Sequence, residues 1–289
     1  MALLRVGSDE HKRLFCRVFV ETHDPYRPSE IVWPELDDAS LARLKSLPVW
    51  DEATRTEAAT AVKVQSLGRT ETDPELAEAI SLQGYEEERH AEVLRLLTAH
   101  YGIARTNVAE PPVPADPRKA FLRTGYGECL DSFFAFGLFR IGADSRLFPD
   151  GITSVFERIM QEEARHILFI VNWAAYLRAR RPLFLRPAFD LWRAWNVGAQ
   201  AFDRVTGALQ MAKGGAKEAK QDGFTMASHT SFGAFSLRSF LELCLRENER
   251  RLAPYDGRLL RPRLAPGTVA AIVKLLPRGK SAPPVGSAA

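Results

Sequence analysis

Apolar residues recur along much of the chain at alternating spacings of three and four, the period of an α-helix that is buried on one side. The clearest examples lie in two stretches, residues 76–101 and residues 156–177. In the first stretch the repeating positions are Leu76, Ile80, Gln83, Glu87, His90, Leu94, Leu97 and Tyr101. In the second they are Phe156, Ile159, Glu163, His166, Ile170, Trp173 and Leu177. The pattern predicts an all-α protein.

Capping and turn residues divide the central part of the chain into four long predicted helices. Asp51 is a candidate N-cap for the first helix, and Asp73 followed by Pro74 is typical of the start of the second. The predicted spans are residues 51–70, 73–102, 118–145 and, after a turn at 148–151, onward to 181. The proline-rich segment 110–117 makes the middle connection long, whereas the other two are short. This arrangement predicts a four-helix bundle with one crossover connection.

The remaining sequence predicts additions to that bundle. Four prolines break up the first 50 residues, so we expect a short helix or strand, an irregular arm and a short helix at Asp38–Ser46. Further helices are predicted over residues 186–211, 228–252 and 268–276, with a mobile loop at Lys213–Gly223. The expected organisation is an arm over 1–50 that packs on the bundle, the bundle over 51–181, a helical extension of the same domain over 182–276 and a disordered tail over 277–289.

Composition narrows the class of protein. The chain has 289 residues, 46% of them hydrophobic and 26% charged, which is ordinary for a globular protein with one large core. A formal net charge of +3 is too small to indicate nucleic-acid binding. The three cysteines, Cys16, Cys129 and Cys244, include no Cys-x-x-Cys pair, which argues against a disulfide framework and fits a reducing cytoplasm. The first residues lack the apolar core of a signal peptide, and the most apolar run, Ile167–Leu177, is too short to span a bilayer.

Both apolar stripes are interrupted by the same motif, Glu-x-x-His. Residues three apart share a face of a helix, so Glu87 and His90 point at one spot, as do Glu163 and His166. A carboxylate within an apolar stripe costs several kcal/mol unless it is paired or bound to a metal. Two such helices packed together present two imidazoles and two carboxylates to one point. That mixed ligand set suits iron or manganese better than calcium or magnesium.

A two-metal site in a helical bundle also needs an acid from each of the other two helices. The helix over 51–70 offers Glu57, with Glu52 as a competitor, and the helix over 118–145 offers Glu128. Each step from one acid to the next along the chain is about one helix plus its connection, so all four carboxylates can lie at one level. Asp131, one turn after Glu128, is an extra ligand, a partner that orients a ligating histidine, or an ordinary polar contact.

This pattern resembles the ferritin-like di-iron carboxylate superfamily over residues 51–181. The resemblance rests on Glu57, Glu87, His90, Glu128, Glu163 and His166. It implies two iron ions, one held by Glu57, Glu87 and His90 and the other by the remaining three residues, with Glu87 and Glu163 bridging. Manganese or a mixed manganese–iron pair is also compatible with these ligands. Members of this superfamily activate dioxygen or peroxide between the metals.

The resemblance implies an oxidase or oxygenase that acts on a small organic substrate, with O₂ and an external electron donor. The alternative within the same superfamily is a ferroxidase or an iron-storage protein. Long additions on both sides of the bundle favour the enzyme, because they obstruct cage assembly. Leu94 stands where a radical-storing tyrosine would lie, which argues against a ribonucleotide reductase radical subunit. The same interpretation allows a homodimer, and a helical scaffold without chemistry is disfavoured by six intact candidate ligands.

Three further features leave alternatives open. We expect Glu86, Glu88 and Glu162 to be solvated or paired with arginine, and Arg89 and Arg165 to pair either across helices or at the surface. Small residues and phenylalanines along 125–142 fit either a cavity or close helix packing. The stretch Arg178–Arg193 holds five arginines among Leu, Phe and Trp, which fits a solvated helix end, a dock for an acidic electron-transfer protein or a position near a membrane.

Overall fold

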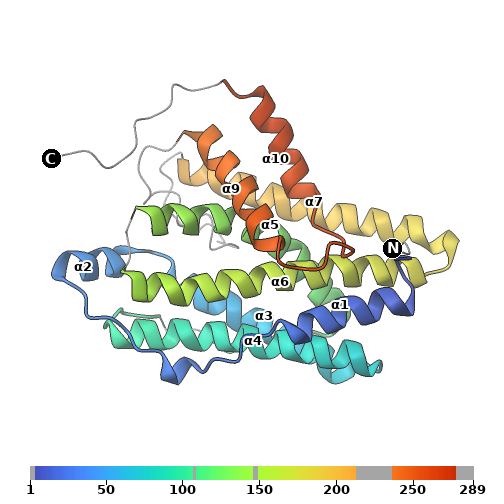
Figure 1. Cartoon of the computed structure of the whole chain (residues 1–289), viewed down its shortest axis with the longest axis horizontal. Helices are drawn as coiled ribbons and strands as arrows, with labels where there is room; N and C mark the ends of the chain where they lie inside the picture. The colour runs from blue at the N-terminus through green and yellow to red at the C-terminus, as the bar shows by residue number, and fades with distance from the viewer. Residues whose placement is uncertain (1–3, 107–108, 146–148, 213–235, 278–289) are drawn as a thin grey trace.

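The computed structural model describes residues 4–106, 109–145, 149–212 and 236–277, and every element within these ranges is a helix. The prediction of an all-α protein is therefore confirmed for the described part of the chain. Four long helices form the centre of the molecule (Figure 1): α3 (Trp50–Thr70), α4 (Pro74–His100), α5 (Pro117–Asp144) and α6 (Asp150–Arg180). Each lies within a residue or two of its predicted span.

Side chains cap two of these four helices, α4 and α5, whereas α3 and α6 begin without a side-chain cap. The Asp73 carboxylate accepts from the backbone N–H groups of Glu75 and Leu76 at the start of α4. Asp116 caps α5 in the same way, through the N–H of Lys119. The prediction that Asp51 caps the first helix is wrong. Helix α3 begins one residue earlier, and the Asp51 carboxylate instead accepts a hydrogen bond from the backbone of Thr106, at 3.0 Å.

Close helix packing brings the four central helices together. Helices α3 and α4 are neighbours over much of their length, as are α5 and α6. A Cβ atom on Gly84 of α4 would lie only 3.0 Å from the backbone nitrogen of Gln65 on α3. On α5, a Cβ atom on Gly125 would lie 2.6 Å from the Ile170 side chain of α6. The largest fully buried side chain in this core is Trp173 of α6, which packs against Phe121 of α5.

The N-terminal segment takes the helical alternative of the two predicted. Helix α1 (Asp9–Glu21) lies against α4 and α6, and an irregular arm then leads through the short 3₁₀-helix η1 (Pro28–Glu30) to α2 (Asp38–Ser46). The arm is held to the bundle by specific contacts, such as the Tyr101 hydroxyl donating to the Pro34 carbonyl at 2.7 Å. It therefore covers one side of the central helices, as Figure 1 shows.

The C-terminal helices pack on α5 and α6. They follow the 3₁₀-helix η2 (Leu183–Leu185) and comprise α7 (Arg186–Ala212), α9 (Leu237–Leu252) and α10 (Leu264–Leu275). The predicted helix over 228–252 begins later than expected, at Leu237, because Ser236 is the N-cap and its side chain accepts from the backbone N–H of Ser239; residues 228–235 lie outside the described residues. Helix α10 begins earlier than predicted because Pro266 lies in its first turn, where a missing N–H is tolerated. The predicted mobile loop at 213–223 and nearly all of the predicted tail lie outside the described residues.

Asn172 joins the two ends of the chain to the bundle. It lies on α6, and its Oδ1 atom is 3.0 Å from His11 Nε2 of α1 and accepts from the backbone N–H of Leu260 at 2.9 Å. Its Nδ2 group donates to the Leu260 carbonyl. Among the described residues, no helix has the length and apolar character needed to cross a membrane.

Candidate metal centre

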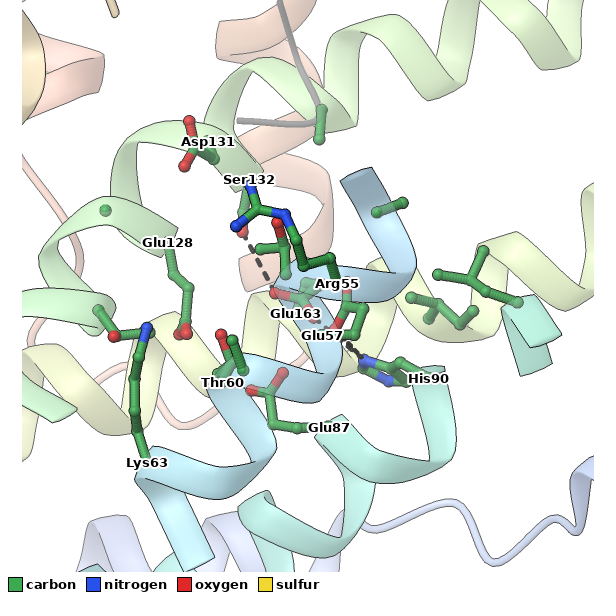
Figure 2. A pocket seen from close by; sticks show the side chains of 18 of the residues that line it. Arg55, Glu57, Thr60, Lys63, Glu87, His90, Glu128, Asp131, Ser132 and Glu163 are labelled. Carbon is green, nitrogen blue, oxygen red and sulfur yellow. Dashed lines mark hydrogen bonds and ion pairs between the residues drawn. The ribbon is translucent and has the colours of Figure 1, made fainter. Parts of the chain in front are cut away.

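Side chains from α3, α4 and α6 meet in the interior of the bundle. One ligand atom from each of Glu57, Glu87, His90 and Glu163 lies within 4.8 Å of the others. Figure 2 shows these side chains converging from their separate helices on one point. The structure thus brings together four of the six ligands expected from the sequence as one compact group.

His90 and His166 lie next to each other and face the carboxylates with the same ring atom. Their rings are stacked, with centroids 5.6 Å apart. His90 Nδ1 is 3.4 Å from Glu57 Oε2 and 3.3 Å from Glu163 Oε1. His166 Nδ1 is 3.0 Å from Glu87 Oε1 and 3.7 Å from Glu163 Oε1. Both Nδ1 atoms are buried without a hydrogen-bond partner, which leaves each free to act as a ligand atom.

Glu87 and Glu163 occupy the middle of the arrangement. Glu163 lies near the Nδ1 atoms of both histidines, and Glu87 belongs to the His90 group while also contacting His166. Neighbouring side chains fix both carboxylates: Gln83 donates to Glu87 at 3.2 Å, and Ser132 donates to Glu163 at 3.3 Å. This central placement is the one that bridging ligands need.

Glu128 of α5 lies on the wall of the same cavity but outside the compact group. Both of its carboxylate oxygens are buried without a hydrogen-bond partner. Burial, together with the neighbouring Glu87 and Glu163 carboxylates, holds the pKa of Glu128 well above its usual range. In Figure 2 its carboxylate points into the space between Lys63, Thr60 and Glu87. Glu128 is thus an acid placed at an energetic cost beside the other ligands.

The pKa of the Glu57 carboxylate is also raised, but less strongly than that of Glu128. Burial and the nearby Glu163 and Glu87 carboxylates raise its pKa to about 7, against the opposing attraction of His90. Its competitor, Glu52, instead pairs with Arg55 at 2.6 Å and is not among the residues whose ligand atoms gather around His90. The structure therefore places Glu57, and not Glu52, at the centre.

Asp131 takes none of the positions that a ligand would need. It lines the cavity, but it is not among the residues whose ligand atoms gather around His90. Figure 2 shows its carboxylate one turn along α5 from Glu128 and turned away from Glu57, Glu87 and Glu163.

Glu86 and Glu162 hold the far sides of the two imidazoles. His166 Nε2 donates to Glu86 Oε2 at 2.9 Å, and His90 Nε2 donates to Glu162 Oε2 at 2.7 Å. Each bond crosses between α4 and α6, and in the neutral imidazole each places the single ring hydrogen on Nε2, so that Nδ1 is the atom available to a metal. Both acids are buried, at 0% and 4% exposure, and both pair with an arginine, so of the two alternatives expected for them the pairing with arginine is confirmed and the solvated one is wrong.

Two buried arginines complete this arrangement. Arg89 of α4 pairs with Glu162 of α6, and Arg165 of α6 pairs with Glu86 of α4. Both guanidinium groups are only 2% exposed, so the cross-helix alternative is confirmed and the surface alternative is wrong for this pair of arginines. Arg89 also donates to the Asp24 and Tyr26 carbonyls of the N-terminal arm. The arm thus seals the side of the centre opposite the cavity.

These charges set the protonation of the centre. The hydrogen bond and charge of His166, with the charge of Arg165, hold the pKa of Glu86 well below its usual range, although burial alone would raise it. Burial lowers the pKa of both histidines, but the surrounding carboxylates outweigh it and raise both values well above the usual range. A cation placed at the Nδ1 atoms would replace the protons that these imidazoles otherwise attract.

A longer repeat than Glu-x-x-His marks these residues in the sequence. Residues 86–90 read Glu-Glu-Glu-Arg-His, and residues 162–166 read Glu-Glu-Ala-Arg-His. The shared pattern is Glu-Glu-x-Arg-His. In each copy, the first Glu and the Arg bind side chains of the opposite helix. Comparison of the two segments over five positions identifies Glu86 and Glu162, which comparison over four positions misses.

A cavity of about 500 Å³ opens beside the carboxylates. Its walls come from α3, α4, α5, α6 and α7, and they include Glu57, Glu87, His90, Glu128 and Glu163. Apolar side chains such as Phe156, Ile159 and Met160 share the walls with the charged side chains of Arg55, Lys63 and Arg123. The volume is sufficient for a small organic molecule.

Both explanations for the small residues of α5 apply, at different positions. Gly127 and Ala135 line the cavity. Gly125 instead permits contact with α6, and Gly137 permits contact with α9, where a Cβ atom would lie 3.3 Å from Cys244 Cα. The helix therefore has one face on the cavity and others in close packing.

Comparisons of the chain with protein-family models, with curated proteins and with solved structures give no match. The argument for a function therefore rests on the residues of the centre and on their geometry.

Proposed function

We propose that this protein is a ferritin-like di-iron carboxylate oxidoreductase that uses O₂ to oxidise or oxygenate a small organic substrate. The observation that carries the proposal is the pair of buried, unbonded Nδ1 atoms of His90 and His166 facing a group of buried carboxylates. The two unpartnered oxygens of Glu128 add to it. Buried polar atoms of this kind are costly unless something binds them, and a pair of cations fits their number and chemistry.

The residues divide between two ions. His90 and Glu57 would hold one, and His166 and Glu128 would hold the other. Glu87 and Glu163, which lie between the histidines, would be shared. This donor set of imidazoles and carboxylates suits iron and also accepts manganese or a mixed pair. When bound there, a pair of irons would supply the redox chemistry needed to activate dioxygen.

The protein's own contribution is to hold the ligands and to bind the substrate. Glu86 and Glu162 orient the imidazoles from behind, and the buried arginines compensate the charge of those two acids. In the metal-free protein, burial and the neighbouring carboxylates raise the pKa of Glu57 to about 7, so this carboxyl group can hold a proton near neutral pH until a cation replaces it. The cavity offers the substrate a position beside Glu57, Glu128 and Glu163. The chain has no Cys-x-x-Cys pair, so we assign the supply of electrons to a separate donor or to the substrate.

The test is the reaction of iron-loaded protein with air. We expect anaerobically loaded Fe(II) protein to consume O₂ and stop after a few electrons per chain. Glu128→Ala should abolish this fast phase, and Glu88→Gln, an exposed acid on α4, should leave it unchanged. Continued uptake of hundreds of irons into a mineral core would establish the storage alternative and overturn the proposal. Absence of any O₂ consumption by loaded protein would also contradict it.

A further inference from the structure

The outward face of α7 is apolar and solvent-exposed along about three turns. Leu191, Trp195 and Phe202 are 74%, 76% and 67% exposed and lie four and seven residues apart, so they share one face of the helix. The opposite face packs on the bundle through Phe189 and Asn196, which are buried. Among the exposed residues between Pro187 and Phe202, the one charged side chain is Arg193.

Two further exposed apolar residues lie on η2, which directly precedes α7 in the chain. Leu183 and Phe184 are 75% and 79% exposed there, between Pro182 and Pro187. We call the exposed set Leu183, Phe184, Leu191, Trp195 and Phe202 the α7 face. Several large apolar side chains exposed on one helix and the turn before it are a feature of interaction sites.

Arginines surround the η2 end of the α7 face. Arg180, Arg181 and Arg193 are exposed, and Arg178 and Arg186 lie beside them partly buried. Asp190, the acid among them, already binds Arg178 through a bidentate pair at 2.6 Å. Arg180 has a 3.7 Å contact with Asp9, and both side chains are largely solvated, so the pair is weak. The charge on this side of the molecule is therefore positive.

We propose that the α7 face binds the surface of a bilayer that contains anionic phospholipids, with α7 lying in the plane of the interface. Exposed Leu, Phe and Trp side chains insert at the boundary between headgroups and acyl chains, and tryptophan prefers that depth. The arginines meet lipid phosphates, which they bind through several N–H groups at once. Stable binding to a membrane interface needs two contributions. Here the insertion of apolar side chains provides one, and the attraction between arginines and lipid phosphates provides the other.

Charge argues against the nearest alternative occupant, a second copy of the chain. In a two-fold contact each copy presents the same surface, so the η2 arginines would face an equally basic patch. Among the described side chains of η2 and α7 the acids are Asp190, which is bound to Arg178, and Asp203, which lines the cavity. A bilayer with anionic headgroups supplies the missing negative charge.

The inference stands apart from the metal centre, although α7 adjoins both. Gln200, on the inward side of the helix, lines the cavity and donates to the Arg123 carbonyl at 2.7 Å. Phe202 and Trp195 face the opposite way. A bilayer on the α7 face would therefore be separated from the cavity by this one helix.

The experiment measures co-sedimentation of the full chain with phosphatidylcholine vesicles, with and without phosphatidylglycerol. The test variant is Phe184→Ser combined with Trp195→Ser. The control variant is Val32→Ser combined with Val113→Ser, which removes two exposed apolar side chains elsewhere. We expect binding to vesicles with phosphatidylglycerol, weakened at least about ten-fold in the test variant and unchanged in the control. Omission of phosphatidylglycerol or addition of salt should also weaken it, because the arginines then lose their partners.

Circular dichroism of the test variant should match the original protein, because both substituted side chains are exposed. Equal vesicle binding by the test variant and the original protein would overturn the proposal, as would no binding by the original protein. If the test variant instead converts a dimer to a monomer in sedimentation analysis, with no vesicle binding, the α7 face is a contact between copies and the proposal is wrong.

Discussion

Three consecutive glutamates on α4 lie in three different environments. Glu86 is buried and bound to His166 and Arg165 of α6, Glu87 faces the metal centre, and Glu88 is half-exposed and pairs with Arg95. Adjacent residues on a helix point about 100° apart. The side chains of one short segment can therefore lie in the core, at a site and on the surface. The role of each acid follows from its direction on the helix and not from its residue type.

The first prediction concerns Glu86. Glu86→Gln keeps the side-chain shape but leaves Arg165 buried without its counter-ion. We expect the metal-free protein to lose about 3 to 5 kcal/mol of unfolding free energy, the usual result of removing one partner of a buried ion pair. Urea denaturation of both proteins measures the difference. Glu88→Gln should change it by less than about 1 kcal/mol, since an exposed pair contributes little. Equal losses in the two variants would show that Glu86 is not buried as described.

The second prediction concerns the pH dependence of the metal-free protein. A carboxylate whose pKa is higher in the folded state stabilises folding at low pH, and this contribution is lost as the pH rises through the folded value. For Glu57 that window runs from about 4.5, its ordinary value, to about 7. The pKa values of Glu128, His90 and His166 are also raised, so all four groups act in the same direction. The chelator-treated protein should therefore become less stable between pH 5 and pH 8, on the order of 1 kcal/mol or more.

Glu128→Gln tests the origin of this effect. It removes the unpaired buried charge, so it should stabilise the metal-free protein at pH 8 by at least about 1 kcal/mol and have little effect at pH 5. Thermal melts in chelator at the two pH values provide the measurement. A variant that is equally or less stable at pH 8 would mean that the Glu128 carboxylate is solvated.

At the scale of elements, α3 and α4 approach each other closely at two glycines, Gly68 of α3 and Gly84 of α4. A Cβ atom at position 84 would lie 2.8 Å from Gln65 Cγ and 3.0 Å from the Gln65 backbone nitrogen. The side chain of Gln65 can move, but its backbone can move only with the whole of α3. Both Glu57 and Glu87 lie on this helix pair, so its spacing also sets the distance between two of the expected ligands.

The third prediction is that Gly84→Ala destabilises the protein by about 1 to 2 kcal/mol, because the packing cost exceeds the gain in helix propensity. Gly198→Ala on α7 is the matched control, since no atom lies within 4 Å of its Cβ position. It should stabilise the protein by about 0.5 to 1 kcal/mol. Chemical denaturation of both variants measures the two effects. A stabilising Gly84→Ala would contradict the close contact.

Most helices could be predicted from the sequence because their boundaries depend on local chemistry. Asp73 with Pro74, and Asp116 with Pro117, define helix starts that need no tertiary contact. The start of α3 could not be predicted in this way, because its N-cap position is Val49 and Asp51 is used by a distant loop. The start of α10 was missed because Pro266 suggests a break, although proline is compatible with a first turn.

At the scale of the whole molecule, the candidate site shows where sequence analysis succeeds and where it fails. Glu87, His90, Glu163 and His166 could be predicted because a charged residue in an apolar stripe is visible in a single helix. Glu86 and Glu162 could not be assigned from single helices, because on its own helix each lies off the stripe. Their partners are on the opposite helix, so their burial follows only from how α4 and α6 pack.

The N-terminal arm and the C-terminal helices give the bundle a closed side and a cavity side. The arm covers Arg89 through the Asp24 and Tyr26 carbonyls, while α7 contributes Gln200 to the cavity wall. The arm and α7 therefore lie against different parts of the central helices. What the additions do for a substrate remains part of the proposed function.

The central claim is that the centre binds two metal ions through the residues described. The direct measurement is elemental analysis of protein loaded anaerobically with Fe(II) and freed of excess iron by gel filtration. The account predicts two irons per chain, fewer in His90→Ala and in His166→Ala with helical content retained, and two in Glu88→Gln. No bound iron or manganese in the original protein, or equal metal content in the histidine variants, would contradict it.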